Sequence, residues 1–408
     1  MVEMNWTENI IKKSSPIAAN SDLERKLVTQ LVSIAKERAN ATCSFGMMMA
    51  AFYDLTISAV YYTNITNSGW LYCNEDSPKL ILPFVNCCPI HALNGKFVFH
   101  KSSKPTSAKI GQATTRILLL FYQEMFKAYG LNIEVLKATE PADTIFIDRQ
   151  RQSVFFGEIK SSPLLTLALS MDCEPQTTYN NDGNIITISH KPVDNPYINK
   201  NVLSIIVPQK NEKNVWEPIY FPIGSKQSNS DADFAYKGIL SLIEDQDFLK
   251  VYLNYWQNSF VAYSKKDESD NIFWLTNACG KPSNLPDDWT GGVTCISDEK
   301  TSVGMDRTDD IKKGIYQVLK LGSEGKNISS NYQYKVGIVS NIHPVRHFDV
   351  YLKPIKDLIW TITEKQGITL AKELPPEQPI YNLFDGIITF TKLYSRDNWV
   401  SNLLTMLK

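Results

Sequence analysis

The chain has 408 residues, 43% of them hydrophobic, so it can bury a large core, and its 42 basic and 43 acidic residues give a net charge of −1. This balance argues against a non-specific polyanion binder but leaves room for a local basic cleft. The sequence opens without an apolar signal core, no apolar run approaches the roughly 20 residues of a membrane span, and seven sparse cysteines favour a reducing, cytoplasmic compartment with no membrane contact.

Two long helices are predicted in the first third of the chain. Residues 22–40 have leucines at helical spacing behind a Ser21 cap, and residues 107–129 form a second amphipathic helix that ends at Gly130. Residues 43–101, between them, hold four cysteines and strand-like runs such as AVYYTNI and GKFVFHK.

Strands are predicted to dominate the next part of the chain. The first three are LNIEVLKA (131–138), TIFID (144–148) and SVFFGEIK (153–160), followed by NIITIS (184–189), LSIIVP (203–208) and PIYFPI (218–223). The remaining expectations are a helical region at 232–256, a hairpin of FVAYS with IFWLT, a long loop at 279–307, a helix at 308–322, a strand at 334–342 and a helical C-terminus.

The hairpin PADTIFIDRQRQSVFFGEIKSS, residues 141–162, places charged side chains in strand-forming surroundings. If its strands pair antiparallel across RQRQ, Asp143 faces Glu158 at roughly 5 Å. The turn length leaves a register shift of one residue open. Because strand side chains alternate between faces, Glu158 and Lys160 project to the same side.

Two opposed carboxylates repel each other, and their burial without a partner is costly. A Mg²⁺ ion removes this cost, since it takes oxygen ligands from one or two carboxylates and keeps its other positions for water and phosphate oxygens. With a lysine beside it, this is the minimal equipment for metal-assisted phosphodiester hydrolysis. The alternative is an exposed hairpin with solvated charges, which the apolar flanks TIFI and VFFG disfavour. Glu140, three residues before Asp143, is either a further carboxylate of the site or, as we favour, a solvated loop acid.

The run Pro-Ala-Asp, followed fifteen residues later by Glu-x-Lys, resembles the signature of the PD-(D/E)xK nucleases, with Ala142 inserted after the proline. The resemblance implies a restriction-endonuclease-like α/β fold, in which a mixed central sheet is flanked by one helix before the motif and one after it. It assigns the binding of Mg²⁺ to Asp143, Glu158 and the carbonyl of Ile159. It assigns the orientation or activation of the attacking water to Lys160.

Polar side chains of the neighbouring helices are candidates for phosphate contacts. Lys313, Gln317 and Lys320 share one face of the later helix, and Gln317 is the expected member of the catalytic site. Lys104 and Lys109 lie at the start of the earlier helix, where phosphates bind readily. Both sets are equally compatible with an ordinary solvated surface.

Thiols and one imidazole gather before the motif, and they predict a structural Zn²⁺ or Fe site built from Cys43, Cys73, Cys87, Cys88 and His91. No C-x₂-C pair is present, so small buried hydrophobes are the alternative. The order of elements, with Thr-Cys-x-Phe at 42–45, is similar to that of restriction endonucleases in which a cysteine-bound iron domain precedes the nuclease core.

Three regions are expected: residues 1–105 with the cysteines, a nuclease core at 106–345 with DNA-recognition segments inserted at about 171–307, and a helical region at 346–408. The polar insertions suit base readout, and cutting both strands of a duplex needs two active sites. The hypothesis is a homodimeric type II restriction endonuclease that cuts double-stranded DNA with Mg²⁺, leaves 5′-phosphate and 3′-hydroxyl ends and has a DNA methyltransferase as genetic partner. The alternatives are a repair or other nuclease of the same superfamily, a non-enzymatic cysteine-metal DNA-binding protein and a catalytically silent interaction protein.

Overall fold

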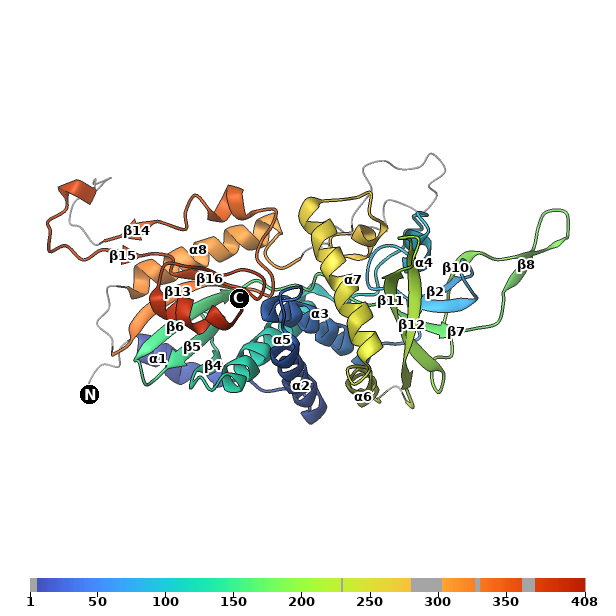
Figure 1. Cartoon of the computed structure of the whole chain (residues 1–408), viewed down its shortest axis with the longest axis horizontal. Coiled ribbons are helices and arrows are strands. Elements are labelled where there is room, and N and C mark those ends of the chain that lie inside the picture. The colour runs from blue at the N-terminus through green and yellow to red at the C-terminus, as the bar shows by residue number, and fades with distance from the viewer. Residues whose placement is uncertain (1–5, 229, 280–302, 327–330, 362–370, 408) are drawn as a thin grey trace.

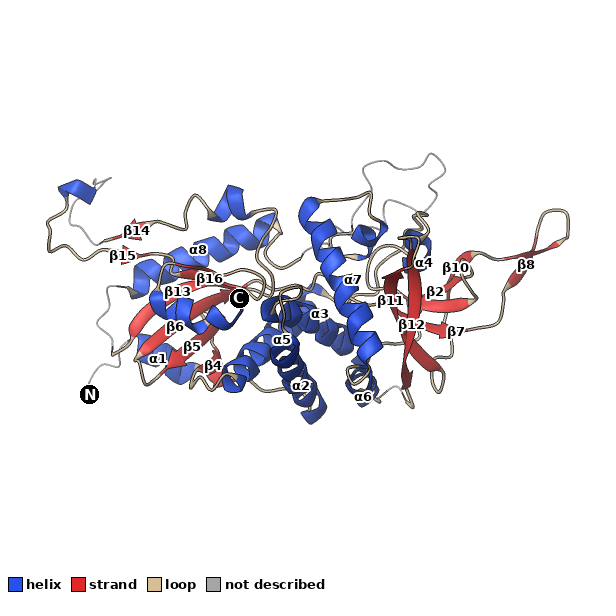
Figure 2. Ribbon diagram, viewed as in Figure 1, coloured by secondary structure: helices blue, strands red, loops and turns tan. Residues whose placement is uncertain are grey.

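The computed structural model describes residues 6–228, 230–279, 303–326, 331–361 and 371–407. These residues form a mixed α/β molecule, which confirms the α/β part of the expected fold class. Two sheets lie at opposite ends, and a layer of helices separates them (Figure 1; Figure 2). No helix in the described ranges is long and apolar enough to cross a bilayer.

The described helices are α1 (Trp6–Lys13), α2 (Asp22–Arg38), α3 (Phe45–Thr63), α4 (Pro89–Leu93), α5 (Ser107–Ala128), α6 (Asp233–Leu242), α7 (Gln246–Lys265), α8 (Thr308–Gly325) and α9 (Asn398–Leu403). The predicted cap of α2 is confirmed, since Ser21 Oγ accepts a hydrogen bond from the Glu24 amide at 3.1 Å. Helix α3 is buried on nearly all sides and runs through the middle of the molecule, as its apolar sequence requires.

The larger sheet, which we call the site sheet, has the order β1-β4-β5-β6-β13-β16-β17. Its strands are β1 (Ser15–Pro16), β4 (Glu134–Lys137), β5 (Thr144–Asp148), β6 (Ser153–Ile159), β13 (Gln333–Val339), β16 (Gly386–Ile388) and β17 (Tyr394–Ser395). Strands β4, β5 and β6 are antiparallel, whereas β13 pairs in parallel with both β6 and β16, so the sheet is mixed.

The second sheet, which we call the distal sheet, is antiparallel with the order β10-β2-β3-β7-β11-β12. Its strands are β10 (His190–Val193), β2 (Trp70–Cys73), β3 (Lys79–Leu82), β7 (Leu169–Asp172), β11 (Val202–Lys210) and β12 (Trp216–Ser225). The hairpin of β8 (Thr177–Tyr179) and β9 (Ile185–Thr187) projects beyond this sheet, and β14 (Ile359–Trp360) pairs with β15 (Tyr381–Asn382) near the site sheet (Figure 1).

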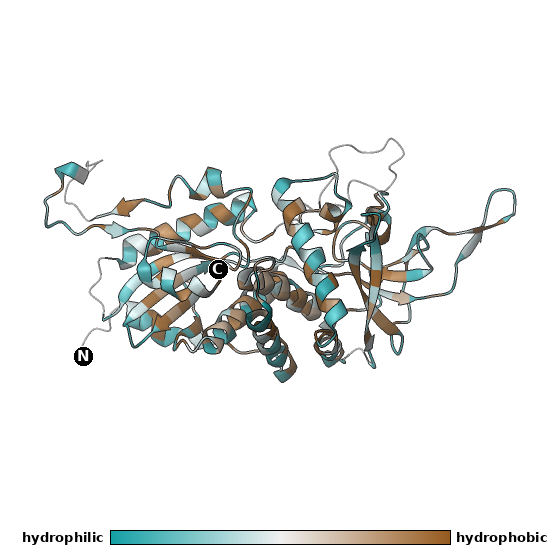
Figure 3. Cartoon of the chain, viewed as in Figure 1, coloured by the Kyte–Doolittle hydropathy of each residue, from teal (hydrophilic) through white to brown (hydrophobic). Residues whose placement is uncertain are grey.

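Each face of the site sheet has its own core. Phe155 and Ile159 of β6 belong to the main core with α3 and α5, while Val154 and Phe156 belong to a second core with α1 and α8. This alternation follows from the period of two along a strand. Apolar residues are accordingly concentrated on the strands and the inner helices, and polar residues on the outer turns (Figure 3).

Two strand predictions are wrong. The run AVYYTNI lies mostly in α3, because its apolar residues are surrounded by core on all sides, a setting that suits a buried helix as well as a strand. FVAYS belongs to α7 and IFWLT to a 3-10 helix at Asn271–Leu275, so the expected hairpin is absent from these residues. GKFVFHK contributes a single bridge, Phe99 to Cys87.

The sheets also cut across the three expected regions. Strands β2 and β3, from residues 1–105, join β7, β10, β11 and β12 from the segment expected as an insertion. The C-terminal region, expected as helical, adds β16 and β17 to the site sheet before α9. Most of the predicted loop at 279–307 lies outside the described residues.

Candidate active site

The predicted register of the charged hairpin is confirmed. Thr144 faces Gly157 and Asp148 faces Ser153, so the next position outward sets Asp143 opposite Glu158. The Asp143 amide continues the ladder by donating to the Gly157 carbonyl at 3.1 Å.

Three charged groups meet at this end of β6. The Asp143 carboxylate accepts a hydrogen bond from the Ile159 amide at 2.8 Å. The Lys160 ammonium donates to the Glu158 carboxylate and to the Ile159 carbonyl, the latter at 3.3 Å. Glu158 is only 6% exposed, while Asp143 and Lys160 are half-buried, so the three charged groups meet around one buried carboxylate.

Burial is the main cause that raises the pKa of Glu158 to about 7, and the nearby charge of Asp143 raises it further, while Lys160 opposes both effects. The positive charge of Lys160 therefore does not fully offset the loss of solvent around Glu158 and the negative charge of Asp143. A further cation at the pair would relieve this cost, which fits the hard oxygen ligands that Mg²⁺ takes. The donors present are two carboxylates and a carbonyl, a set that fits such an ion.

Close packing around β6 fixes the geometry of the site. A Cβ at Gly157 would lie 2.8 Å from Thr144 Cγ2 and 2.9 Å from Val339 Cγ2, so no larger residue fits between the neighbouring strands. Helix α8 covers the charged face at Gly314, where a Cβ would lie 3.5 Å from Lys160 Cγ and 3.9 Å from Glu158 Cγ. These separations are ordinary van der Waals contacts, so α8 lies directly against the charged pair at this position.

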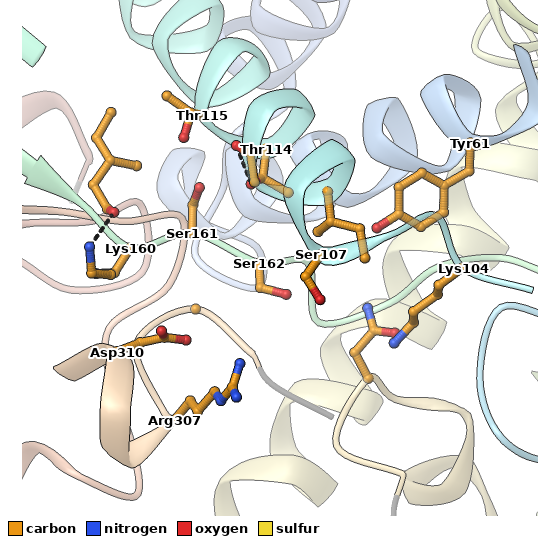
Figure 4. A pocket seen from close by; sticks show the side chains of 15 residues that line it. Tyr61, Lys104, Ser107, Thr114, Thr115, Lys160, Ser161, Ser162, Arg307 and Asp310 are labelled. Atoms are coloured by element: carbon orange, nitrogen blue, oxygen red, sulfur yellow. Dashed lines mark hydrogen bonds between the residues drawn. The ribbon is translucent and has the colours of Figure 1, made fainter. Parts of the chain in front are cut away.

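A pocket of about 250 Å³ opens beside Lys160 (Figure 4). The first turns of α5, the segment after β6 and the start of α8 form its walls. Lys104, Lys160 and Arg307 supply positive charge, and Asp310 supplies one carboxylate. The hydroxyl groups in the lining belong to Tyr61, Ser107, Thr114, Thr115, Ser161 and Ser162. This combination of cations, hydroxyls and a helix N-terminus suits phosphate oxygens.

The segment after β6 is fastened to the strand beside it. The Lys160 amide donates to the Val339 carbonyl at 3.1 Å. The Asn341 side chain accepts from the Ser162 amide at 3.2 Å and donates to the Ser162 carbonyl at 2.8 Å. The pocket wall thus has a rigid backbone.

The residues predicted to contact phosphate lie in different places relative to the pair of Asp143 and Glu158. Lys104 lines the pocket, and Lys109 lines an adjoining pocket of about 560 Å³ that Lys104 also borders. Gln317 is half-buried one helical turn beyond Gly314, and no hydrogen bond among the described residues joins it to the carboxylates. Lys313 and Lys320 are exposed, and Lys320 lies 4.0 Å from Glu324.

Sequence reasoning missed Arg307 and Asp310. Both lie about 150 residues after the motif, and only the return of the chain into β13 beside β6 carries them to the pocket. The available signal was the polar run MDRTDD directly before the predicted helix at 308–322.

Three of the predicted metal ligands come together elsewhere, at the edge of the distal sheet. Cys73, Cys88 and His91 are all buried and could hold a metal ion, because their ligand atoms lie within 4.8 Å of one another. His91 Nδ1 lies 3.4 Å from Cys73 Sγ and 3.3 Å from Cys88 Sγ.

The other two predicted ligands are wrong. Cys43 precedes α3 in the helical layer and is not in the group. Cys87 points away from Cys88 toward the Trp274 carbonyl at 3.1 Å and Cys279 Sγ at 3.8 Å, because consecutive extended residues face opposite ways. Burial raises the pKa of the Cys43 thiol, as expected for a small apolar side chain.

The geometry carries the functional argument alone: comparison with models of protein families, with curated proteins and with solved structures gave no match to this chain.

Proposed function

We propose that the chain is a Mg²⁺-dependent nuclease of the PD-(D/E)xK type that hydrolyses phosphodiester bonds in double-stranded DNA. The observation that carries this proposal is the meeting of Asp143, Glu158, Lys160 and the Ile159 carbonyl at the end of one buried strand. A charge cluster with no function would face water, whereas Glu158 in this cluster is buried and lies against α8.

Each protein group has a definite role in this proposal. Asp143, Glu158 and the Ile159 carbonyl would hold Mg²⁺, which when bound supplies Lewis-acid stabilisation of phosphate oxygens and lowers the pKa of a water molecule. Lys160 keeps a positive charge beside the carboxylates, where it orients the attacking water and balances the negative charge that develops on the phosphate. The hydrogen bond from the Ile159 amide holds the Asp143 carboxylate in its position.

The adjoining pocket extends the site along a phosphate backbone. Lys104 and Arg307 face the space next to Lys160 from two different elements, so a second phosphate can be held while the first reacts (Figure 4). This positioning converts an intermolecular reaction into an intramolecular one, which accounts for much of the rate enhancement in enzymes of this kind.

Site-specific cleavage is the version of this activity that we favour. Near-neutral net charge suits an enzyme that reads bases better than one held by charge alone. A second subunit would supply the second active site needed to cut both strands, with 5′-phosphate and 3′-hydroxyl products. A type II restriction endonuclease of this kind would have a DNA methyltransferase as genetic partner and would carry structural Zn²⁺ or Fe in its cysteine-histidine group.

The test is cleavage of supercoiled plasmid by the purified chain with Mg²⁺, followed by sequencing of the cut ends. Asp143→Asn should lower the rate at least about 100-fold, the scale of losing one electrostatic contact to the transition state. Glu140→Gln, which neutralises an exposed acid in the same loop, is the matched control and should cut at the wild-type rate. Equal cleavage by wild type and Asp143→Asn would overturn the proposed site.

A further inference from the structure

The group of Cys73, Cys88 and His91 already has the spacing of ligands around a small tetrahedral ion. With Zn–S of about 2.3 Å and Zn–N of about 2.0 Å, a sulfur and a nitrogen on one tetrahedral zinc lie about 3.5 Å apart. The two distances from His91 Nδ1 to the thiols, 3.4 Å and 3.3 Å, match this value closely. Three ligands leave one tetrahedral position to fill.

A carboxylate on the other side of the His91 ring indicates which ring nitrogen faces the thiols. His91 Nε2 lies 3.6 Å from Glu75 Oε2, on the opposite side of the ring from Nδ1. This separation is longer than a hydrogen bond, but a carboxylate on this side favours the proton on Nε2, which leaves the unprotonated Nδ1 directed at the thiols.

His190 stands just outside this group. It is the cross-strand partner of Cys73 in the β10–β2 ladder, so both side chains project from the same face of the distal sheet. Its ring centroid lies 5.3 Å from that of His91, at 88° to it. Its Nε2 is buried and has no hydrogen-bond partner among the described residues, so turning the ring toward the thiols would break no hydrogen bond of that atom.

We propose that His190 is the fourth ligand of a structural zinc site formed with Cys73, Cys88 and His91. Two thiolates and two imidazoles in tetrahedral arrangement favour Zn²⁺ among the common biological metals. Binding releases the protons of the two thiols to solvent, and no oxidation or reduction takes place.

The zinc would fasten the projecting hairpin to the body of the protein. Strand β10 is at the edge of the distal sheet and pairs with β2 alone, and the β8–β9 hairpin leads directly into it. Ligands from β2, from the start of α4 and from β10 would join three segments that are distant in sequence. The site therefore sets the direction of a hairpin with exposed apolar residues at Tyr179 and Ile185, whatever the activity at Asp143.

The first experiment measures zinc and iron in the purified full-length chain after dialysis. We expect about one zinc per chain, and less than about 0.2 equivalents of zinc would overturn the zinc assignment, as would iron in its place. Replacement by Co²⁺ should give the visible absorption of a four-coordinate ion together with thiolate-to-cobalt charge transfer. Six-coordinate absorption would overturn the site.

The second experiment tests His190 itself. His190→Asn should lose zinc to a chelator at least about tenfold faster than wild type, the scale on which changes around a metal act. The matched control is His343→Asn, because His343 is a buried histidine after β13 of the site sheet whose Nδ1 and Nε2 also lack a partner among the described residues. Equal zinc retention in the two variants would overturn the proposal.

A third variant separates ligation from packing. His190→Cys should retain zinc and increase the thiolate-to-cobalt absorption by about half, because three thiolates then replace two. Unchanged absorption would contradict direct ligation, even if His190→Asn proved unstable. Hydrogen exchange in residues 185–193 should slow on zinc binding in wild type but not in His190→Asn.

Discussion

Glu158 makes the stability of the protein depend on pH in a direction opposite to that of an ordinary paired carboxylate. Its pKa is raised from 4.5 to about 7 by burial and by the charge of Asp143. Below pH 4.5 the group is protonated in both the folded and the unfolded chain, so its contribution is constant. As the pH rises from 4.5 to 7, the unfolded chain releases this proton while the folded chain keeps it, and the folded state loses stability.

The size of the effect follows from the shift. A difference of about 2.5 units at about 1.4 kcal/mol per unit amounts to about 3 kcal/mol, complete above pH 7. Unfolding entropy of about 2 cal/mol/K per residue over 408 residues converts this to a change in Tm of about 3–4 °C. Glu158→Gln removes the titration, so without metal its Tm relative to wild type should rise by this amount between pH 4.5 and pH 8.

The assay is differential scanning calorimetry of wild type, Glu158→Gln and the exposed control Glu140→Gln, each with and without Mg²⁺. Taking differences between variants cancels the titration of all other groups. Mg²⁺ should stabilise wild type at pH 8, where the carboxylates are ionised, and have little effect on Glu158→Gln. A pH-independent difference between wild type and Glu158→Gln would refute the raised pKa, and equal stabilisation by Mg²⁺ would refute metal binding at the pair.

Three further substitutions test other parts of the site. Lys160→Ala should lower kcat for DNA cleavage by about 100-fold or more, and a wild-type kcat would exclude its catalytic role. Lys104→Ala should weaken binding uniformly across sequences and reduce the slope of log K against log salt by about one, measured by fluorescence anisotropy; an unchanged slope would mean that it contacts no phosphate. Gly314→Ala should raise the free energy of unfolding in urea by about 0.5–1 kcal/mol, because its Cβ would make contacts of ordinary length. Gly322→Ala should lower it, because its Cβ would lie 2.7 Å from the Leu383 carbonyl oxygen. Equal effects of the two alanines would contradict this packing.

The charged hairpin was predictable because its information is local. The short polar turn between two apolar runs narrows the pairing to neighbouring registers, and the register found in the structure places Asp143 opposite Glu158. The two long helices before the motif, α2 and α5, were predictable for the same reason, since their end signals and apolar stripes lie within their own sequence. The sequence did not distinguish helix from strand where an apolar run is buried on every side, as in α3, because polar and apolar residues then do not alternate with a helical or strand period.

The group of Cys73, Cys88 and His91 was not predictable from local sequence. The spacing of Cys73, Cys88 and His91 matches no common zinc motif, since a strand, a turn and a short helix deliver the three ligands separately. His190 follows about 100 residues later and reaches the group only through the pairing of β10 with β2. The number and spacing of the cysteines predicted a metal site in the correct region of the sequence. They could not distinguish Cys88 from Cys87, because that choice depends on the direction of each side chain in the folded chain.

The topology of the site sheet brings the residues of the proposed phosphate site to one edge. Strands β6 and β13 are parallel, so their carboxyl ends reach the same edge, which is where α/β sheets generally bind ligands. Helix α8 leads back into β13, and its first turn therefore lies at this edge, where the first turns of α5 also line the pocket. Lys104, Lys160 and Arg307 share this edge with three carboxylates, Asp143, Glu158 and Asp310, so a bound divalent cation would be needed to make the local side-chain charge positive. The same edge holds the buried carboxylate pair, so phosphate and divalent cation would each lower the cost of binding the other.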